Sequence, residues 1–446
     1  MKRWTACVAV LLLPAAQAAG DGPLRERARA AMDKAAAFFR SISTHGGYVG
    51  ILSLDLKKRY GEALYERAKP TQIWVQPPGT PSVGEVYLRA WRATGEKRYL
   101  TAARDVGRAL AWGQRTTGGW DHRVDVAHLT PQAARPVRRG THCTFDDCIT
   151  QGPLRFLMDL DQVLDEPWLT ESIELAWKHM LAAQFPNGAW PQWYPLRGGY
   201  HDYYTFNDAA INDCIAVMLK AHRLYGKAEH LRSAKRGGDF IILSQLDPPQ
   251  AGWAQQYSHD LKPAKARSFE PAGVCSAVAV RNIRTLVELY LATREEKYLR
   301  PIPKAAAWLE KSKLGRNLWA RLYEVGTNRP IYGDRDGKVH YTLQEISRER
   351  RSGYSWQSSY GVPAVLSTYR RVRQIGAEAY LAARSKPPSA AARSSYARRL
   401  EPTVERIIAS LDAKGRWVTG GMIHCATFVA NFGTLCRYVE LTKPAS

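Results

Sequence analysis

Residues 184–216 read QFPNGAWPQWYPLRGGYHDYYTFNDAAINDCIA and connect two segments whose apolar residues have helical spacing. The first predicted helix ends near Gln184 and the second begins near Thr205. A connection of about twenty residues is long for a compact domain, and long loops are more often functional. This one is rich in aromatic residues, proline and glycine, so we expect it to form part of a site.

The order helix, short turn, helix, long loop recurs along the chain. Helical spacing predicts pairs at 82–93 and 97–113, at 147–163 with a second helix to 184, and at 208–224 with a second helix to 245; a fourth pair runs from about 271 towards 308. Leucines near the short turns recur at intervals of 62 to 69 residues: Leu100, Leu169, Leu231 and Leu299. Such a period is the sequence signature of stacked helical hairpins.

Hairpins that cannot bury both faces alone must stack on their neighbours. We therefore predict an all-α fold, an (α/α) toroid or incomplete α/α barrel of repeated helical hairpins, with a few short strands in its loops. Because short turns alternate with long loops, the long loops should all lie at one end. Gly415-Arg416-Trp417 and a final helix at 429–441 repeat the pattern imperfectly, 385–395 reads as a solvated loop, and 328–357 as an irregular segment with a short hairpin.

The first residues, MKRWTACVAVLLLPAAQAAG, have the pattern of a secretory signal peptide. Lys2 and Arg3 precede an apolar run that is too short to span a bilayer, and Ala16-Gln17-Ala18 offers a cleavage site. We assign 1–19 to the signal and 20–446 to a single α/α-toroid domain, and we expect a secreted or periplasmic protein without a membrane span. Six cysteines remain after cleavage; an even number permits disulfides, but the sequence does not give their pairing.

The formal net charge of +23 indicates a polyanionic partner. For an exported protein this could be an acidic polysaccharide, a membrane surface or nucleic acid. No basic zipper, zinc finger or RNA-binding motif is present, so nucleic acid is the weaker candidate. The absence of a Gly-x-Ser-x-Gly motif, a phosphate loop and a Cys-x-x-Cys pair argues against a serine hydrolase, an NTPase and a zinc enzyme.

Two copies of one short motif open successive hairpins: Thr144-Phe145-Asp146-Asp147 and Thr205-Phe206-Asn207-Asp208. A threonine followed by an acidic residue in the first turn is a common helix cap. Each copy, however, carries two consecutive side chains with oxygen atoms, and both copies should lie at the loop end of the toroid. Clustered oxygen ligands suit a hard cation such as calcium, although the spacing is not that of an EF-hand.

Other side chains in the loops could contact a ligand. The loop before the second motif carries Trp190 and several tyrosines; such rings are usually core residues, but in a loop with proline and glycine they could stack on sugars. His201-Asp202 could be a ligand pair or a hydrogen-bonded loop latch. Downstream, Arg267, Arg335 and Arg350 stand in basic runs that could grip carboxylates, or could equally form solvated salt bridges.

Five motifs between Thr144 and Trp356 resemble, in family order, the pectate lyases of polysaccharide lyase family 10, which are pectic acid lyases with an α/α toroid fold. The motifs are TFDD, PNGAWPQWYPLRGGYHDYYTFND, ARSFEP, NRPIYGDRDG and ERRSGYSW. The resemblance implies calcium-assisted β-elimination of polygalacturonate without hydrolysis, Ca²⁺ as the cofactor, and an acidic polysaccharide as the substrate. We expect a monomer.

The resemblance also implies a role for each matching residue. Asp146 and Asp208 would be catalytic and would bind the calcium or the substrate carboxylate, and Arg267 would be the base that removes the C5 proton. The implied substrate-binding residues are Arg335, Arg350, Asn207, Asp147, Trp190, Tyr200 and His201. An arginine base is unusual because guanidinium normally stays protonated, so we expect an alkaline optimum.

Two alternatives remain open. The protein could be a lyase for another uronate polymer such as alginate, or a non-catalytic protein that binds acidic glycans. The segment 272–278 lacks an acidic side chain that the family carries after its FEP motif, and Cys148 and Cys214 lie just beyond the two acidic motifs. Both differences could alter the substrate or the activity.

Overall fold

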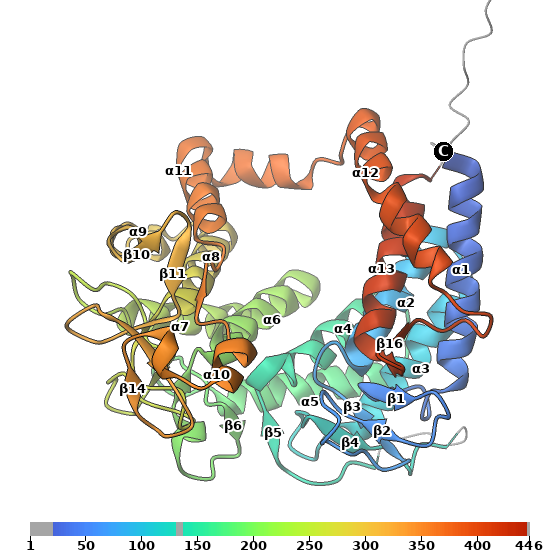
Figure 1. Cartoon of the computed structure of the whole chain (residues 1–446), viewed down its shortest axis with the longest axis horizontal. Helices are drawn as coiled ribbons and strands as arrows, with labels where there is room; N and C mark the ends of the chain where they lie inside the picture. The colour runs from blue at the N-terminus through green and yellow to red at the C-terminus, as the bar shows by residue number, and fades with distance from the viewer. Residues whose placement is uncertain (1–20, 131–136, 444–446) are drawn as a thin grey trace, which may run out of the picture.

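Helices dominate the computed structural model, which describes residues 21–130 and 137–443. They form hairpins arranged around a ring (Figure 1). The helices that pack against one another along the inside are α2 (Thr80–Thr94), α4 (Gln151–Asp161), α6 (Ala210–Tyr225), α8 (Ser276–Thr293), α11 (Val362–Ser385) and α13 (Cys425–Leu441). Their partners are α1 (Asp21–Ser41), α3 (Lys97–Gly113), α5 (Pro167–Ala183), α7 (Ala228–Leu243), α9 (Ile302–Lys311) and α12 (Ala390–Ala409). The α/α toroid and the four hairpins predicted from sequence are confirmed.

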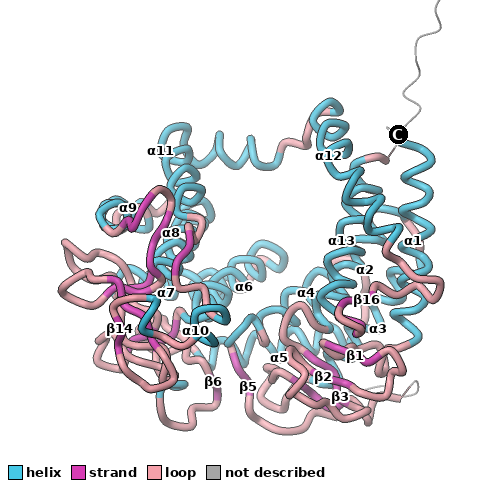
Figure 2. The backbone as a smooth tube through the Cα atoms, viewed as in Figure 1, coloured by secondary structure: helices cyan, strands magenta, loops and turns pink. Residues whose placement is uncertain are grey.

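Long loops follow the outer helices and contain the short strands (Figure 2). The strands are β1 (Ile51–Ser53), β2 (Arg59–Tyr60), β3 (Gln72–Trp74), β4 (Arg123–Asp125), β5 (Cys143–Thr144), β6 (Trp193–Tyr194), β7 (Tyr204–Thr205), β8 (Gln256–Tyr257), β9 (Val274–Cys275), β10 (Lys313–Gly315), β11 (Leu318–Ala320), β12 (Leu322–Tyr323), β13 (Pro330–Gly333), β14 (Val339–His340), β15 (Gln357–Ser358), β16 (Val418–Thr419) and β17 (Met422–His424). The same loops contain the 3₁₀ turns η1 (Asp146–Cys148), η2 (Tyr200–Asp202), η3 (Asn207–Ala209) and η5 (Leu343–Glu345) and the short helix α10 (Arg348–Gly353); η4 (Glu296–Tyr298) lies in the turn between α8 and α9.

Antiparallel ladders join neighbouring long loops at five positions around the ring, and no described ladder joins the loop between α9 and α11 to the loop between α12 and α13. They pair β17 with β1, β3 with β4, β5 with β6, β7 with β8, and β9 with β12. Between β5 and β6, Cys143 lies opposite Tyr194 and Thr144 opposite Trp193. These ladders therefore fix the loop that carries the first acidic motif against the aromatic loop.

A tryptophan after five of the six outer helices, α3, α5, α7, α9 and α12, closes the end of that helix. The indole Nε1 donates to a carbonyl of the last helical turns at 2.6 to 2.9 Å, and the five tryptophans are Trp120, Trp190, Trp253, Trp319 and Trp417. Carbonyls at a helix end have no partner within the helix, so these bonds satisfy them in the buried interior. The Trp417 bond shows that the imperfect repeat in the tail is structurally a full copy.

Two segments outside the four hairpins give opposite outcomes. The short hairpin predicted within 328–357 is present as β13 and β14. The prediction of a solvated loop at 385–395 is wrong, because α12 begins at Ala390 and Ser389 caps it by accepting a hydrogen bond from the backbone N–H of Ala392. Alanine favours helix, and the serine supplies the N-cap.

The predicted signal peptide, residues 1–19, lies outside the described residues. Among the helices that the structure describes, none is long and apolar enough to cross a membrane. The six cysteines at 143, 148, 214, 275, 425 and 436 are all free thiols.

Candidate active site

The two acidic motifs fold into matching 3₁₀ turns at the loop end of the ring. In η1 the Thr144 hydroxyl accepts the backbone N–H of Asp146 at 3.0 Å, and in η3 the Thr205 hydroxyl accepts that of Asn207 at 3.1 Å. The N-cap positions of these turns are Phe145 and Phe206, neither of which makes a side-chain capping bond, and the α-helices begin a few residues later. The prediction that Thr144 and Thr205 are helix N-caps is therefore wrong; each threonine instead bonds to the backbone two residues ahead.

Both turns hold their second acidic residue in the left-handed region of the backbone. The φ angle is +46° at Asp147 and +45° at Asp208, and the next residue of each turn is also left-handed. Such conformations cost free energy for residues other than glycine and tend to occur at functional sites. Because both turns show the same strain, we infer that the fold maintains the direction of the Asp147 and Asp208 carboxylates.

The turns bring three carboxylates together. Single oxygen atoms of Asp146, Asp147 and Asp208 all lie within 4.8 Å of one another. Each carboxylate also accepts a hydrogen bond from a side-chain amide: Asp146 from Gln192 at 2.7 Å, Asp147 from Gln76 at 2.9 Å, and Asp208 from Asn207 at 2.6 Å. We call these three residues the acidic cluster.

Crowding makes the acidic cluster hard to ionise without a counter-charge. Burial and the charges of Asp208 and Asp147 raise the pKa of Asp146 to about 7, against the opposing hydrogen bond from Gln192. Burial and the charges of Asp208 and Glu62 raise the pKa of Asp147 to about 6. Like charges at this distance favour a bound cation.

Buried oxygen atoms of the cluster have room for a metal. Within the described part of the chain, Asp146 Oδ1 and Asn207 Oδ1 are buried and accept no hydrogen bond. Buried acceptors normally have a partner, and carboxylate and amide oxygens are the ligands that calcium prefers. The residues present therefore fit a hard divalent cation.

Three arginines gather around one aromatic ring beside the cluster. The guanidinium carbons of Arg267, Arg335 and Arg350 lie 4.8, 5.6 and 4.4 Å from the ring centroid of Phe269. They come from the loop before β9, the turn between β13 and β14, and α10. Glu349 pairs with both Arg335, at 3.1 Å, and Arg350. The arginines that the sequence scattered over more than eighty residues thus form one basic surface, which we call the arginine cluster.

Arg267 is held in a two-pronged ion pair. Its Nε and Nη2 donate to Glu270 at 2.7 Å each, and the Tyr354 hydroxyl donates to the same carboxylate at 2.9 Å. The Glu270 side chain is 2% exposed, whereas that of Arg267 is 47% exposed. The bond to Glu270 raises the pKa of Arg267, and the charge of Asp208 adds to this effect. Conversely, Arg267 opposes the rise in the pKa of Asp147, so Arg267 lies within electrostatic range of the acidic cluster.

The aromatic loop supplies one wall of this region. Burial raises the pKa of Tyr200, the charge of Arg267 opposes this rise, and the charges of Glu270 and Asp146 add to it, so Tyr200 lies within electrostatic range of both clusters. The rings of His201 and Trp193 stack with centroids 3.4 Å apart. Asp202 accepts the backbone N–H groups of Arg197 and Gly198 at 3.0 and 2.6 Å, so this residue is the loop latch that the dipeptide suggested.

The structure contradicts one of the predicted substrate-binding residues, Trp190. Trp190 is fully buried and its indole caps α5 at Met180, so its ring offers no face to a sugar. The expectation that Trp190 binds substrate is wrong. The position belongs to the structural series of tryptophans that follow the outer helices, and the repeat with Trp120 and Trp253 was the signal for this in the sequence.

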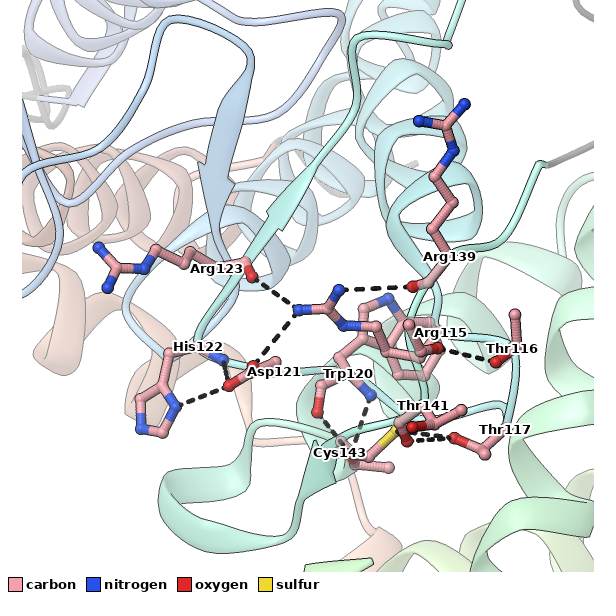
Figure 3. A network of polar contacts seen from close by, with 12 residues as sticks. Arg115, Thr116, Thr117, Trp120, Asp121, His122, Arg123, Arg139, Thr141 and Cys143 are labelled. Atoms are coloured by element: carbon pink, nitrogen blue, oxygen red, sulfur yellow. Dashed lines mark hydrogen bonds and ion pairs between the residues drawn. The ribbon is translucent and has the colours of Figure 1, made fainter. Parts of the chain in front are cut away.

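A further polar network centres on Asp121 (Figure 3). Asp121 accepts the backbone N–H of His122 at 2.7 Å and lies 3.1 Å from His122 Nδ1, and Arg115 donates to Asp121 at 3.3 Å. Burial lowers the pKa of His122, but Asp121 and the charges of Asp146 and Asp147 outweigh it and leave the pKa raised. His122 therefore lies within the field of the cluster.

Several residues that complete the site were not predicted from the sequence. Gln76 belongs to the loop before α2, and Arg321, whose guanidinium lies 4.4 Å from the Tyr354 ring, follows β11. Neither stands in a recognisable motif. Gln192 and Glu270 lie within quoted motifs, and their proximity to charged residues was the available signal.

The sequence profile of the pectic acid lyases matches residues 114–317 and 304–365, which together exceed half of the chain. The chain belongs to the pectic acid lyase family. The resemblance seen between Thr144 and Trp356 is thereby confirmed, and the protein is a polysaccharide lyase. No curated protein matches the chain.

Two solved structures support the fold of this pectic acid lyase. One is the D189A mutant of a family 10 polysaccharide lyase from Cellvibrio cellulosa in complex with trigalacturonic acid; it is 22% identical with a TM-score of 0.52, and the match covers 66% of the present chain and 98% of that chain. The other is a family 10 polysaccharide lyase from the same organism, 22% identical with a TM-score of 0.51, where the match covers 67% and 97%. About a third of the present lyase therefore lies outside the shared fold.

Proposed function

We propose that this lyase is an exported pectate lyase that cleaves polygalacturonate (pectic acid) by Ca²⁺-assisted β-elimination. The observation that carries the proposal is the placement of the acidic cluster, with its unpartnered buried oxygens, opposite the arginine cluster. A polymer of uronates needs both a cation and guanidinium groups for its carboxylates. The trigalacturonic acid bound by the related Cellvibrio enzyme supports the same class of substrate.

Asp146, Asp147 and Asp208, with the Asn207 oxygen, would hold the calcium. When bound, calcium would withdraw electron density from a uronate carboxylate and make the neighbouring C5 proton more acidic. Arg335 and Arg350 already bind the carboxylate of Glu349, and they would orient uronates in the same manner.

Arg267 would act as the base in its neutral form. It would take the C5 proton, the electron pair would form the C4–C5 double bond, and the C4–O4 bond would break, with the departing oxygen taking up a proton. The product end would carry an unsaturated uronide. Because Glu270 favours the protonated form of Arg267, the neutral form becomes populated only at high pH, which supports the expected alkaline optimum.

The activity is tested by incubating the purified protein with polygalacturonate and calcium while following the ultraviolet absorbance of unsaturated uronides. We expect activity that a chelator abolishes and that Arg267→Ala lowers by roughly a hundredfold or more, the usual contribution of a positioned base. The matched control is Arg398→Ala on the exposed part of α12. Activity that persists with chelator, or an Arg267→Ala variant as active as wild type, would contradict the mechanism. Cleavage of alginate but not of polygalacturonate would show that alginate is the substrate.

Calcium binding is also testable through stability, independently of turnover. In the calcium-free protein the raised pKa of Asp146 and Asp147 means that the folded state binds protons more tightly than the unfolded chain. The stability that these two carboxylates contribute should therefore be highest below about pH 4, where unfolded aspartate titrates, and fall as the pH rises through 6 to 7. Calcium at a hundredfold excess over its Kd should restore roughly 2.7 kcal/mol.

We expect calcium to raise the melting temperature clearly at pH 8 and much less at pH 5, where the carboxylates hold protons. Asp146→Asn should raise the melting temperature of the calcium-free protein at pH 8 and reduce the calcium response. Differential scanning calorimetry measures both quantities. An equal calcium response at the two pH values would show that the ion binds elsewhere.

Export is a separate part of the proposal. The signal-like residues 1–19 support secretion or a periplasmic location. Expression of the full chain followed by N-terminal sequencing of the exported protein should find a new terminus near residue 20. If the exported or cytosolic protein still begins at Met1, the proposed cleavage and export are contradicted.

A further inference from the structure

A cavity adjoins the acidic cluster through Gln76, which lines the cavity and donates a hydrogen bond to Asp147. Its volume is about 110 Å³, and it lies between the loop before α2 and the start of α13. The side chains that matter for its chemistry are Glu62, Trp74, Gln76, Pro77, His424 and Ala426. All of them lie outside the matched family segments at 114–317 and 304–365, so the family profile does not describe this cavity.

Gln76 connects the cavity to the acidic cluster. Its Nε2 donates to Asp147 at 2.9 Å and to Glu62 at 3.2 Å. Two carboxylate acceptors fix the orientation of the amide, so the other atom is the carbonyl oxygen. A ligand in the cavity would therefore sit beside the unit held at the acidic cluster.

The carbonyl oxygen of Gln76 has no donor. The residue is 6% exposed, and among the residues that the structure describes, none donates to its Oε1. A buried acceptor without a donor costs roughly 1–3 kcal/mol, so it favours a ligand that brings an N–H or O–H group. The cavity therefore favours a ligand that carries a hydrogen-bond donor.

The charge of the cavity decides which sugar it accepts. Glu62 adds a second acceptor, and no arginine or lysine side chain lines the described walls. A uronate carboxylate offers only acceptors and would meet the negative charge of Glu62 and of Asp147 beyond it. An uncharged sugar offers hydroxyl donors to Gln76 and Glu62, and Trp74 and Pro77 provide an apolar wall.

We infer that this cavity is a substrate subsite for an uncharged sugar unit, a methyl-esterified uronate or a neutral sugar, that neighbours the charged unit at the acidic cluster. The inference rests on the proposed lyase function and adds a specificity to it. The enzyme would prefer partly esterified or interrupted chains to fully charged polygalacturonate.

The test compares kcat/KM on partly methyl-esterified and on fully de-esterified polygalacturonate at saturating calcium. Ala426 is exposed on the first turn of α13 and lines the cavity, so Ala426→Leu fills the subsite without touching the carboxylates. The matched control is Ala430→Leu, one turn further along the exposed side of the same helix. Glu62→Gln removes the charge and keeps the shape.

We expect the wild type and Ala430→Leu to favour the esterified polymer, and Ala426→Leu to lose at least threefold of that preference. Glu62→Gln should raise kcat/KM on the de-esterified polymer. Mass spectrometry of the products should find the uncharged unit at one fixed position from the new chain end. Whether that unit is a methyl-esterified uronate or, in mixed polymers, a neutral sugar shows which of the two the subsite binds. An unchanged preference in both variants would overturn the subsite. A wild type that is inactive on both polymers would instead overturn the lyase function on which the subsite rests.

Discussion

At the scale of single residues, the ion pair between Arg267 and Glu270 governs how the base can work. Glu270 accepts two hydrogen bonds from the guanidinium and one from Tyr354, so it fixes the side chain and also favours its protonated form. Orientation and basicity are thus set by the same carboxylate. Removal of the Glu270 carboxylate should make Arg267 easier to deprotonate but leave its side chain less well oriented.

We predict that Glu270→Gln lowers kcat and moves the rising limb of the pH–rate profile to lower pH by about one unit or more, the usual effect of a close opposite charge. The sign follows because the base acts when neutral, and losing the negative partner lowers the pKa of Arg267. The profile of kcat/KM against pH measures the shift, with Glu405→Gln on exposed α12 as the control. A limb that stays in place would mean that another group limits the rate.

At the scale of elements, three glutamines join successive outer helices from α3 to α9. The side-chain amide of Gln184 donates to the Gly188 carbonyl at 2.9 Å and to the Ser233 carbonyl of α7 at 3.0 Å, and its oxygen accepts the Ser233 hydroxyl at 2.8 Å. Gln114 and Gln245 make the corresponding pairs of bonds in their own repeats. These buried bridges hold the start of each long loop against the neighbouring hairpin.

Gln184→Met keeps the volume but removes the amide bonds to the Gly188 and Ser233 carbonyls and takes the acceptor from the buried Ser233 hydroxyl. We expect it to lower the free energy of unfolding by about 1–3 kcal/mol. Urea denaturation followed by circular dichroism measures the change. Gln374→Met on the exposed surface of α11 should be within about 0.5 kcal/mol of wild type; equal stability of the two variants would show that the bridge contributes nothing.

The helices were predictable because the spacing of their apolar residues is a local pattern. The site was predictable only for the residues that belong to a recognisable sequence motif. Apolar spacing located the four hairpins, and the TFDD and TFND motifs located the turns of the acidic cluster. Trp190 was misread because an aromatic residue in a loop looks the same whether it caps the preceding helix or faces solvent. Only the repeated bond to a carbonyl of the preceding helix distinguishes the two.

At the scale of the whole molecule, closure of the ring brings together residues that no local pattern connects. The ladder between β1 and β17 holds the loop before α2 against the segment before α13. Gln76 thereby reaches Asp147, and Ala426 reaches the same cavity from the other end of the chain. This contact depends on the order of hairpins around the ring, so the sequence alone did not reveal it.

The net charge of +23 acts over the whole molecule as well. Long-range attraction of a polyanion is screened beyond about 10 Å at 0.1 M salt, whereas the contacts of a bound substrate are shorter. We therefore predict that raising the ionic strength from about 20 to 300 mM at saturating calcium increases KM for polygalacturonate at least threefold and leaves kcat nearly constant. Steady-state kinetics on the polymer and on a trimer separates the contributions, since the trimer carries fewer charges and should respond less. An equal response of trimer and polymer would place the salt effect in the acidic and arginine clusters and not in the field of the whole protein.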